Sequence, residues 1–161
     1  DDGMENALIS GIAFQKDQVK FTLHGVGDIP GTAFKILGPI SEKDIEVDVI
    51  VQNVSVDGKT DFTFTVSKDD ESDVKDIIEE IKKEVEFKDL MINSDIAKVS
   101  LVGVGMRTHA GIASKAFKAL SENDVNIQII STSEIKITMV IDKSLVEKAV
   151  QVLHVEFELD K

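Results

Sequence analysis

The 161-residue sequence contains no cysteine, tryptophan or tyrosine and only two prolines. Without cysteine there can be no disulfide, thiolate metal site or cysteine nucleophile, and the absence fits a reducing, cytoplasmic setting. Without tryptophan and tyrosine, only phenylalanine could stack on the bases of a single-stranded nucleic acid. No apolar run is long enough to predict a membrane-spanning helix.

Positive charge is also scarce. Lysine and arginine number 18 against 30 aspartates and glutamates, which gives a formal net charge of -12. Nucleic acids and anionic membrane surfaces are bound through basic faces. The composition therefore predicts neither a nucleic acid nor a membrane as a partner.

Metal-binding and catalytic patterns are missing as well. The three histidines, His24, His109 and His154, form no His-x-x-x-His pair for zinc. The acidic run Asp69–Asp73 lacks the spacing of an EF-hand and is typical of the first turn of a helix. We therefore expect no catalytic residue, no metal site and no cofactor in this chain.

The sequence does contain an internal repeat. The segment Lys20–Gly27 aligns with Lys98–Gly105, and Ser41–Ile45 aligns with Ser121–Val125 after two extra residues in the second copy. A unit that occurs twice predicts two similar structural units.

Each copy has the hydrophobic spacing of a β-α-β-β-α unit with one further strand. The predicted class is therefore α+β, with two ferredoxin-like βαββαβ domains whose antiparallel sheets carry their helices on one face. Gly38-Pro39 is expected to kink the first helix or end it early. The expected strands are 8–14, 19–23, 45–51, 61–66, 87–92, 98–102, 135–139 and 155–159, and the expected helices are 33–40, 74–85, 113–120 and 144–153.

The glycine-rich loop of each copy is the candidate for a ligand site. A dinucleotide fingerprint is disfavoured, because the third glycine, Gly31 or Gly111, comes too late and the next strand is hairpin-linked. Free backbone N–H groups at residues 31 to 33 would suit a carboxylate, and Asp28 would suit an ammonium group. An amino-acid site is one interpretation; the other is that Asp28 caps a helix and the glycines only turn the chain.

Five motifs, in order and at consistent spacing, carry a family likeness that covers nearly the whole chain from Leu8. The chain resembles the regulatory region, or beta subunit, of aspartate kinase, which consists of tandem ACT domains. The motifs are Leu8–Ala13, Gly27–Gly31, Val51–Ser55, Gly103–His109 and Ile130–Ile135.

The resemblance implies a function and a domain plan. A first ACT domain would span 17–92, and a second would span 93–161 and be completed by the amino-terminal strand 7–14. Such domains bind threonine, lysine or both and feedback-inhibit the phosphorylation of aspartate. The resemblance also implies a homodimer and a catalytic domain or subunit as partner, since the motifs of the kinase portion are absent here. Whether the chain is a separate subunit or part of a longer one stays open.

The resemblance places ligands where the first domain of one copy meets the second domain of another. The first site would use Asp28, Gly31, Thr32, Ala33, Gln52 and Asn53, with Asn126 and Ile127 across the interface. The second loop would use Met106, Thr108, His109, Gly111, Ile112, Ser131, Thr132 and Ser133. In this loop Ala110 stands where the family commonly has proline, which should loosen it.

Two other functions are weighed against this one. A free-standing pair of ACT domains could regulate another enzyme of amino-acid metabolism. A small enzyme of ferredoxin-like fold is the third hypothesis, and the lack of a credible nucleophile, metal set or cofactor loop disfavours it.

Overall fold

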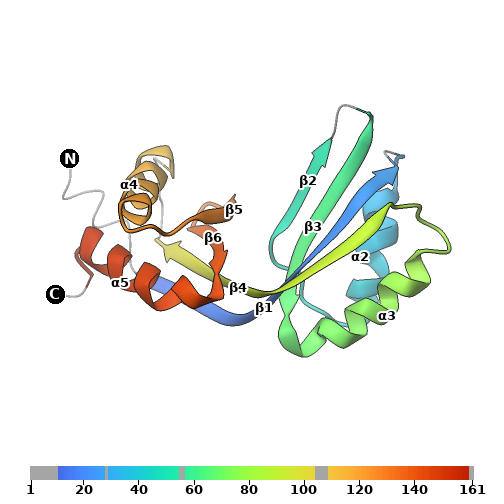
Figure 1. Cartoon of the computed structure of the whole chain (residues 1–161), viewed down its shortest axis with the longest axis horizontal. Coiled ribbons are helices and arrows are strands. Elements are labelled where there is room, and N and C mark those ends of the chain that lie inside the picture. Colours follow the sequence, from blue (N-terminus) through green and yellow to red (C-terminus); the bar gives the residue numbers. More distant parts are fainter. Residues whose placement is uncertain (1–10, 28, 55–56, 104–108, 160–161) are drawn as a thin grey trace. The chain divides into compact units, whose positions relative to one another are not determined.

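The computed structural model describes residues 11–27, 29–54, 57–103 and 109–159. The chain forms two units, one made of residues 17–94 and the other of Asp1–Lys16 with Asp95–Lys161 (Figure 1). They are called the first and the second unit below. The two long strands β1 (Gly11–Gly27) and β4 (Asp89–Val102) each supply residues to both units.

The first unit is a sheet with two helices. Its strand order is β2-β3-β1-β4, and β3 pairs antiparallel with both β1 and β2. Both helices bury one side in a core with the sheet, because their apolar residues recur every three or four positions. The remaining elements of this unit are α2 (Thr32–Glu42), β2 (Ile50–Val54), β3 (Lys59–Ser67), the 3-10 turn η1 (Lys68–Asp70) and α3 (Glu71–Ile81).

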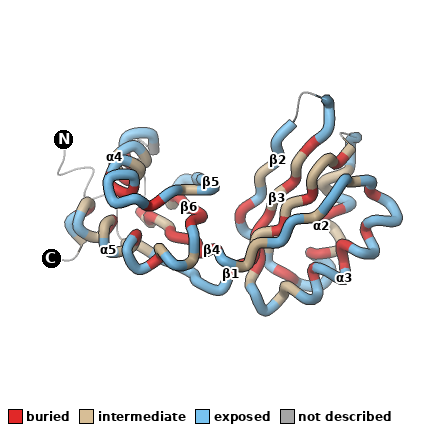
Figure 2. The backbone as a smooth tube through the Cα atoms, in the orientation of Figure 1, coloured by how far each residue is buried: buried red, intermediate tan, exposed pale blue. Residues whose placement is uncertain are grey.

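The second unit repeats this plan. Its strand order is β1-β4-β6-β5, with β6 antiparallel to both β4 and β5. The remaining elements are α4 (His109–Glu122), β5 (Ile127–Thr132), β6 (Lys136–Asp142), the 3-10 turn η2 (Lys143–Leu145) and α5 (Val146–Glu156). In each unit, most of the buried residues lie on the inner strands and on the helices, whereas the edge strands β2 and β5 contain none (Figure 2). The α+β class with helices on one face of each sheet is confirmed.

The long strands differ from the sequence prediction. Segments 8–14 and 19–23 were expected as separate strands, as were 87–92 and 98–102, but from Gly11 onward each pair is one continuous strand. The intervening residues, such as Gln15–Gln18 and Asn93–Asp95, are polar and do not continue the apolar alternation of the flanking segments. They contain no glycine or proline, and backbone pairing in a sheet does not require apolar side chains.

The carboxyl-terminal segment 155–159 is not a strand. Helix α5 continues to Glu156 and ends in a turn in which Glu158 has φ 56 and Leu159 N–H bonds to the carbonyl of His154. Valine, phenylalanine and leucine alternate here with acidic residues, which suggested a strand. The residues buried in the core are instead Ala149, Leu153 and Phe157, which follow one another at the four-residue spacing of one helical face.

Helix α2 does not end early at Gly38-Pro39, although an early end is one of the two outcomes expected from the sequence. It contains Pro39 and continues to Glu42. Ile36 and Ile40, one helical turn apart on either side of the Gly38-Pro39 pair, are both fully buried. Burying both side chains offsets the hydrogen bond that proline removes. The strand expected at 45–51 begins only at Ile50, and the helix expected at 144–153 spans Val146–Glu156.

Two phenylalanines form the centre of the first core. Phe21 on β1 and Phe64 on β3 are fully buried, and their rings stack with centroids 5.5 Å apart. We predict that Phe64→Ala lowers the free energy of unfolding by about 3–5 kcal/mol, because it leaves a cavity and removes the stacked partner. Thermal and urea unfolding followed by circular dichroism measure this.

The matched control is Phe34→Ala, since Phe34 is 78% exposed on α2. It should change the free energy of unfolding by no more than about 0.5 kcal/mol. Equal losses for the two variants would contradict the assignment of Phe64 to the core.

Candidate functional site

The first candidate loop joins β1 to α2. The N-cap residue of α2 is Gly31, whose φ of 91 lies in the left-handed region and which offers no capping side chain. Within this loop the N–H of Ile29 donates to the carbonyl of Gly27, and the N–H of Thr32 donates to the carbonyl of Ile29. The sequence predicted free N–H groups at residues 31 to 33; for Thr32 this is wrong, because the turn before the helix uses its N–H. Asp28 lies outside the described residues.

Gln52 and Asn53 lie on β2, which β3 separates from β1, and they lie on opposite faces of the sheet. Gln52 on β2 pairs with Phe62 on β3, and Asn53 pairs with Asp61. Directly opposed residues share a face, and Phe62 belongs to the buried core beneath the helices. Gln52 is thus on the face of α2, while Asn53 is on the other face with Asp61. Both side chains are exposed.

Asn126 and Ile127 line a cavity of about 530 Å³ in the second unit. Its walls come from the end of α4, the turn that follows, and β5. Asp124 in that turn has φ 60, and its N–H donates to the carbonyl of Ser121. Phe117 and Ile130 complete an apolar side, so the cavity combines an amide, a carboxylate and hydrocarbon surface.

The second candidate loop is described only in part. Met106 and Thr108 lie outside the described residues, and His109 is the first residue of α4. Gly111 is exposed, whereas Ile112 is 1% exposed in the core, which leaves only its backbone for a ligand. Ser131 and Thr132 end β5 opposite Thr138 and Ile137, and they therefore lie on opposite faces.

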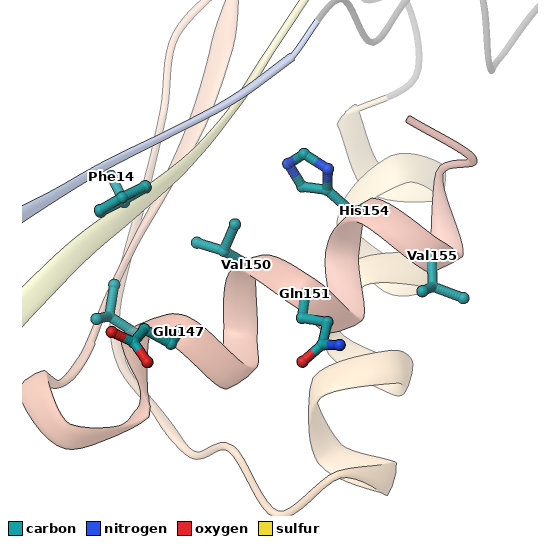
Figure 3. A pocket seen from close by; sticks show the side chains of 7 residues that line it. Phe14, Glu147, Val150, Gln151, His154 and Val155 are labelled. Atoms are coloured by element: carbon teal, nitrogen blue, oxygen red, sulfur yellow. The ribbon is translucent and has the colours of Figure 1, made fainter. Parts of the chain in front are cut away.

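A separate apolar groove lies on the outside of α5. It measures about 400 Å³ and lies between Phe14 on β1 and one side of the helix, with Val150, His154 and Val155 among its lining residues (Figure 3). None of the predicted site residues lines it. In the described part of the chain, no group of three metal-binding side chains is present.

None of the helices found in the described residues is both long and apolar enough to cross a membrane.

Comparisons with known proteins agree on the class. A family described as ACT domain matches residues 23–86, and a second family, also described as ACT domain, matches residues 99–157. An aspartate kinase from Pseudomonas fluorescens is 54% identical over 160 residues, or 99% of this chain and 39% of that protein. An aspartokinase from Helicobacter pylori is 45% identical over 158 residues, or 98% of this chain and 38% of that protein.

Two solved structures match over almost their entire chains. A chain from a crystal structure of aspartokinase alpha and beta subunits has a TM-score of 0.85 and 43% identity, with 93% of this chain and 99% of that chain covered. The ligand-free regulatory subunit of aspartate kinase from Thermus thermophilus has a TM-score of 0.86 and 33% identity, with the same coverage.

The fold and the two matched segments define a tandem ACT-domain module. With the identities and coverages above, the chain belongs to the aspartate kinase family, as its regulatory ACT region. It spans about 39% of the length of the Pseudomonas relative.

Sequence reasoning missed Thr60, which lies beside the first loop. Thr60 on β3 pairs with Val26 on β1 and with Val54 on β2, and only 1% of it is exposed. Its hydroxyl is buried and has no hydrogen-bond partner among the described residues. Leaving a buried hydroxyl unpaired costs about 1–3 kcal/mol.

We predict that Thr60→Val raises the free energy of unfolding by about 1 kcal/mol, because valine has nearly the same shape without the unpaired hydroxyl. The control is Thr63→Val on the same strand, because the Thr63 hydroxyl lies 3.1 Å from that of Thr22. This control should be neutral or destabilising in the same melting experiment. A loss of stability in Thr60→Val would show that the Thr60 hydroxyl finds a partner in solution.

Proposed function

We propose that this chain is an amino-acid-sensing regulatory module of aspartate kinase that mediates feedback inhibition by threonine, lysine or both in the cytoplasm. The observation that carries the proposal is the match over 99% of a chain from the aspartokinase alpha and beta subunit structure, at 43% identity and with both ACT units present. Phosphorylation of aspartate would be performed by a catalytic domain or subunit with which this module associates.

The first ligand site would lie at the start of α2. Exposed N–H groups at a helix amino terminus favour a carboxylate, and Asp28 would hold the ligand's ammonium group. Gly31 and Ala33 would supply backbone N–H groups, and Thr32, whose N–H is bonded to the carbonyl of Ile29, would lie between them, with Gln52 and Asn53 on β2 nearby. The second loop, from Met106 to Ile112 with Ser131, Thr132 and Ser133, would form a related site.

The ligand sites would be completed in a homodimer. In this arrangement Asn126 and Ile127 of the partner copy would face the first loop. Exposed apolar residues support association along the edge strands, because Val54 on β2 is 66% exposed and Ile130 on β5 is 46% exposed. The ACT domains would span 17–92 and 93–161, with strand 7–14 completing the second.

A screen of the twenty amino acids by thermal shift tests the proposal. We predict that threonine stabilises the protein, with lysine as the other candidate. A ligand at 100 times its dissociation constant should add about 2.7 kcal/mol to the free energy of unfolding. Glutamate and glycine serve as the internal comparison. If threonine and lysine both give no shift and no calorimetric heat, the proposed ligands are wrong; a shift with another amino acid alone would favour a sensor for a different pathway.

A substitution at Asp28 tests the site itself. We predict that Asp28→Ala weakens threonine binding by about two orders of magnitude or more, because the ligand's ammonium group loses its counter-charge in a desolvated site. Isothermal titration calorimetry measures the affinity, and the melting temperature should change little.

The control is Asp76→Ala, which removes the same charge from the exposed surface of α3. It should leave the affinity unchanged. An Asp28→Ala variant that binds normally but melts earlier would mean that Asp28 has only a local structural role.

A further inference from the structure

Strand β1 contains a bulge just before the first loop. Leu23 pairs with Phe62 and Val26 with Thr60, so His24 and Gly25 together stand opposite Asp61 alone. Gly25 has φ 67, and a Cβ there would lie 3.0 Å from the Cβ of Lys88. Both the backbone angle and the space therefore require glycine at this position.

Asp61 holds this bulge through its side chain. Its Oδ1 accepts the N–H of Gly25 at 3.1 Å, and its Oδ2 lies 3.5 Å from Nδ1 of His24. The other ring nitrogen of His24, Nε2, lies 3.0 Å from Sδ of Met91 on β4. A bulge interrupts the backbone ladder, and here the carboxylate supplies the acceptor that the ladder does not.

The bulge is followed by the first candidate loop, which leads to the start of α2. Gly27, two residues after Gly25, accepts the N–H of Ile29 at 3.0 Å. The hydroxyl of Thr32 lies 2.7 Å from the carbonyl oxygen of Ile29 and 3.3 Å from that of Gly27. Gly27 therefore links the bulge to the hydrogen bonds that close the first turn of α2.

The described residues of the second copy do not show this arrangement. Ser100 and Thr138 form the same cross-strand hydroxyl pair, at 3.0 Å, as Thr22 and Thr63. On that alignment Lys136 occupies the position of Asp61, and the N–H of Gly103 donates to the backbone carbonyl of Ile135. The bond from a strand side chain to the glycine amide before the loop is thus seen in the first unit, whereas the aligned glycine of the second unit bonds to the backbone.

We propose that Asp61 is a positioning residue for the first candidate loop, which joins β1 to α2. By bonding the Gly25 amide it fixes the bulge, and through Gly27 it fixes the backbone of α2 that receives the ligand's carboxylate. The inference rests on the proposed function and assigns to this site a residue that does not itself touch the ligand.

The test compares Asp61→Ala with Asp61→Asn, with L-threonine as the calorimetric probe. Asp61→Ala should weaken threonine binding about tenfold, because the loop must be ordered on binding. Asp61→Asn keeps an oxygen acceptor for the Gly25 amide and should bind within about threefold of the wild type. Asp61 is 43% exposed, so both variants should fold.

Two controls separate positioning from stability. Ile78→Val in the core of α3 should lower the melting temperature without changing threonine affinity, since Ile78 is fully buried and outside the loop. Lys136→Ala, at the aligned position of the second unit, should leave threonine affinity unchanged. If Asp61→Ala melts earlier but binds threonine as the wild type does, the proposal is overturned.

Amide hydrogen exchange without ligand provides a second readout. The amides of Gly25 and Thr32 should exchange faster in Asp61→Ala than in the wild type and Asp61→Asn, while those of α3 should not change. Equal exchange in all three proteins would overturn the positioning role even if the wild type binds no threonine. Absence of threonine and lysine binding by the wild type, with the expected exchange pattern, would instead overturn the proposed ligands and retain the role of Asp61 in setting the start of α2.

Discussion

Both units depend on hydrogen bonding between β1 and β4. Each four-stranded sheet needs a stretch of both strands, although residues 11–16 and 95–102 of the second unit are far apart in the chain. A sheet of fewer strands would leave the core residues of the helices uncovered, and small sheets are only marginally stable alone. The strand pairing is therefore part of both cores, the one around Phe21 and Phe64 and the one around Leu101 and Ile137.

The two copies of the repeat resemble each other more closely in backbone geometry than in side chains. The turn after the first helix of each unit places Asp44 and Asp124 at φ 58 and 60, and each donates its N–H to an equivalent serine carbonyl. The hydroxyl pairs Thr22–Thr63 and Ser100–Thr138 occupy equivalent strand positions. The ends of β1 and β4 differ, however, and these ends lead into the two candidate ligand loops.

The candidate site was predictable from sequence only in outline. The glycine-rich segments and their repeat located the first loop correctly at the start of a helix. Asp61 and Thr60 were missed because nothing in their local sequence distinguishes them from other polar positions of an alternating strand. Their importance comes from strand register, which sets Asp61 opposite a bulge and buries Thr60 beside Val26.

What the sequence by itself determined is the duplicated α+β plan, because hydrophobic spacing and the aligned glycine motifs are local signals. Only the tertiary structure decided the continuity of β1 and β4, the helical state of residues 155–156 and the passage of α2 through Pro39. In each of these cases local preference was weak or opposed to the outcome, and the fold was set by backbone pairing or by burial of residues such as Ile40 and Phe157. Strand pairing and burial depend on contacts between segments that are far apart in the chain. A short stretch of sequence carries no information about these contacts.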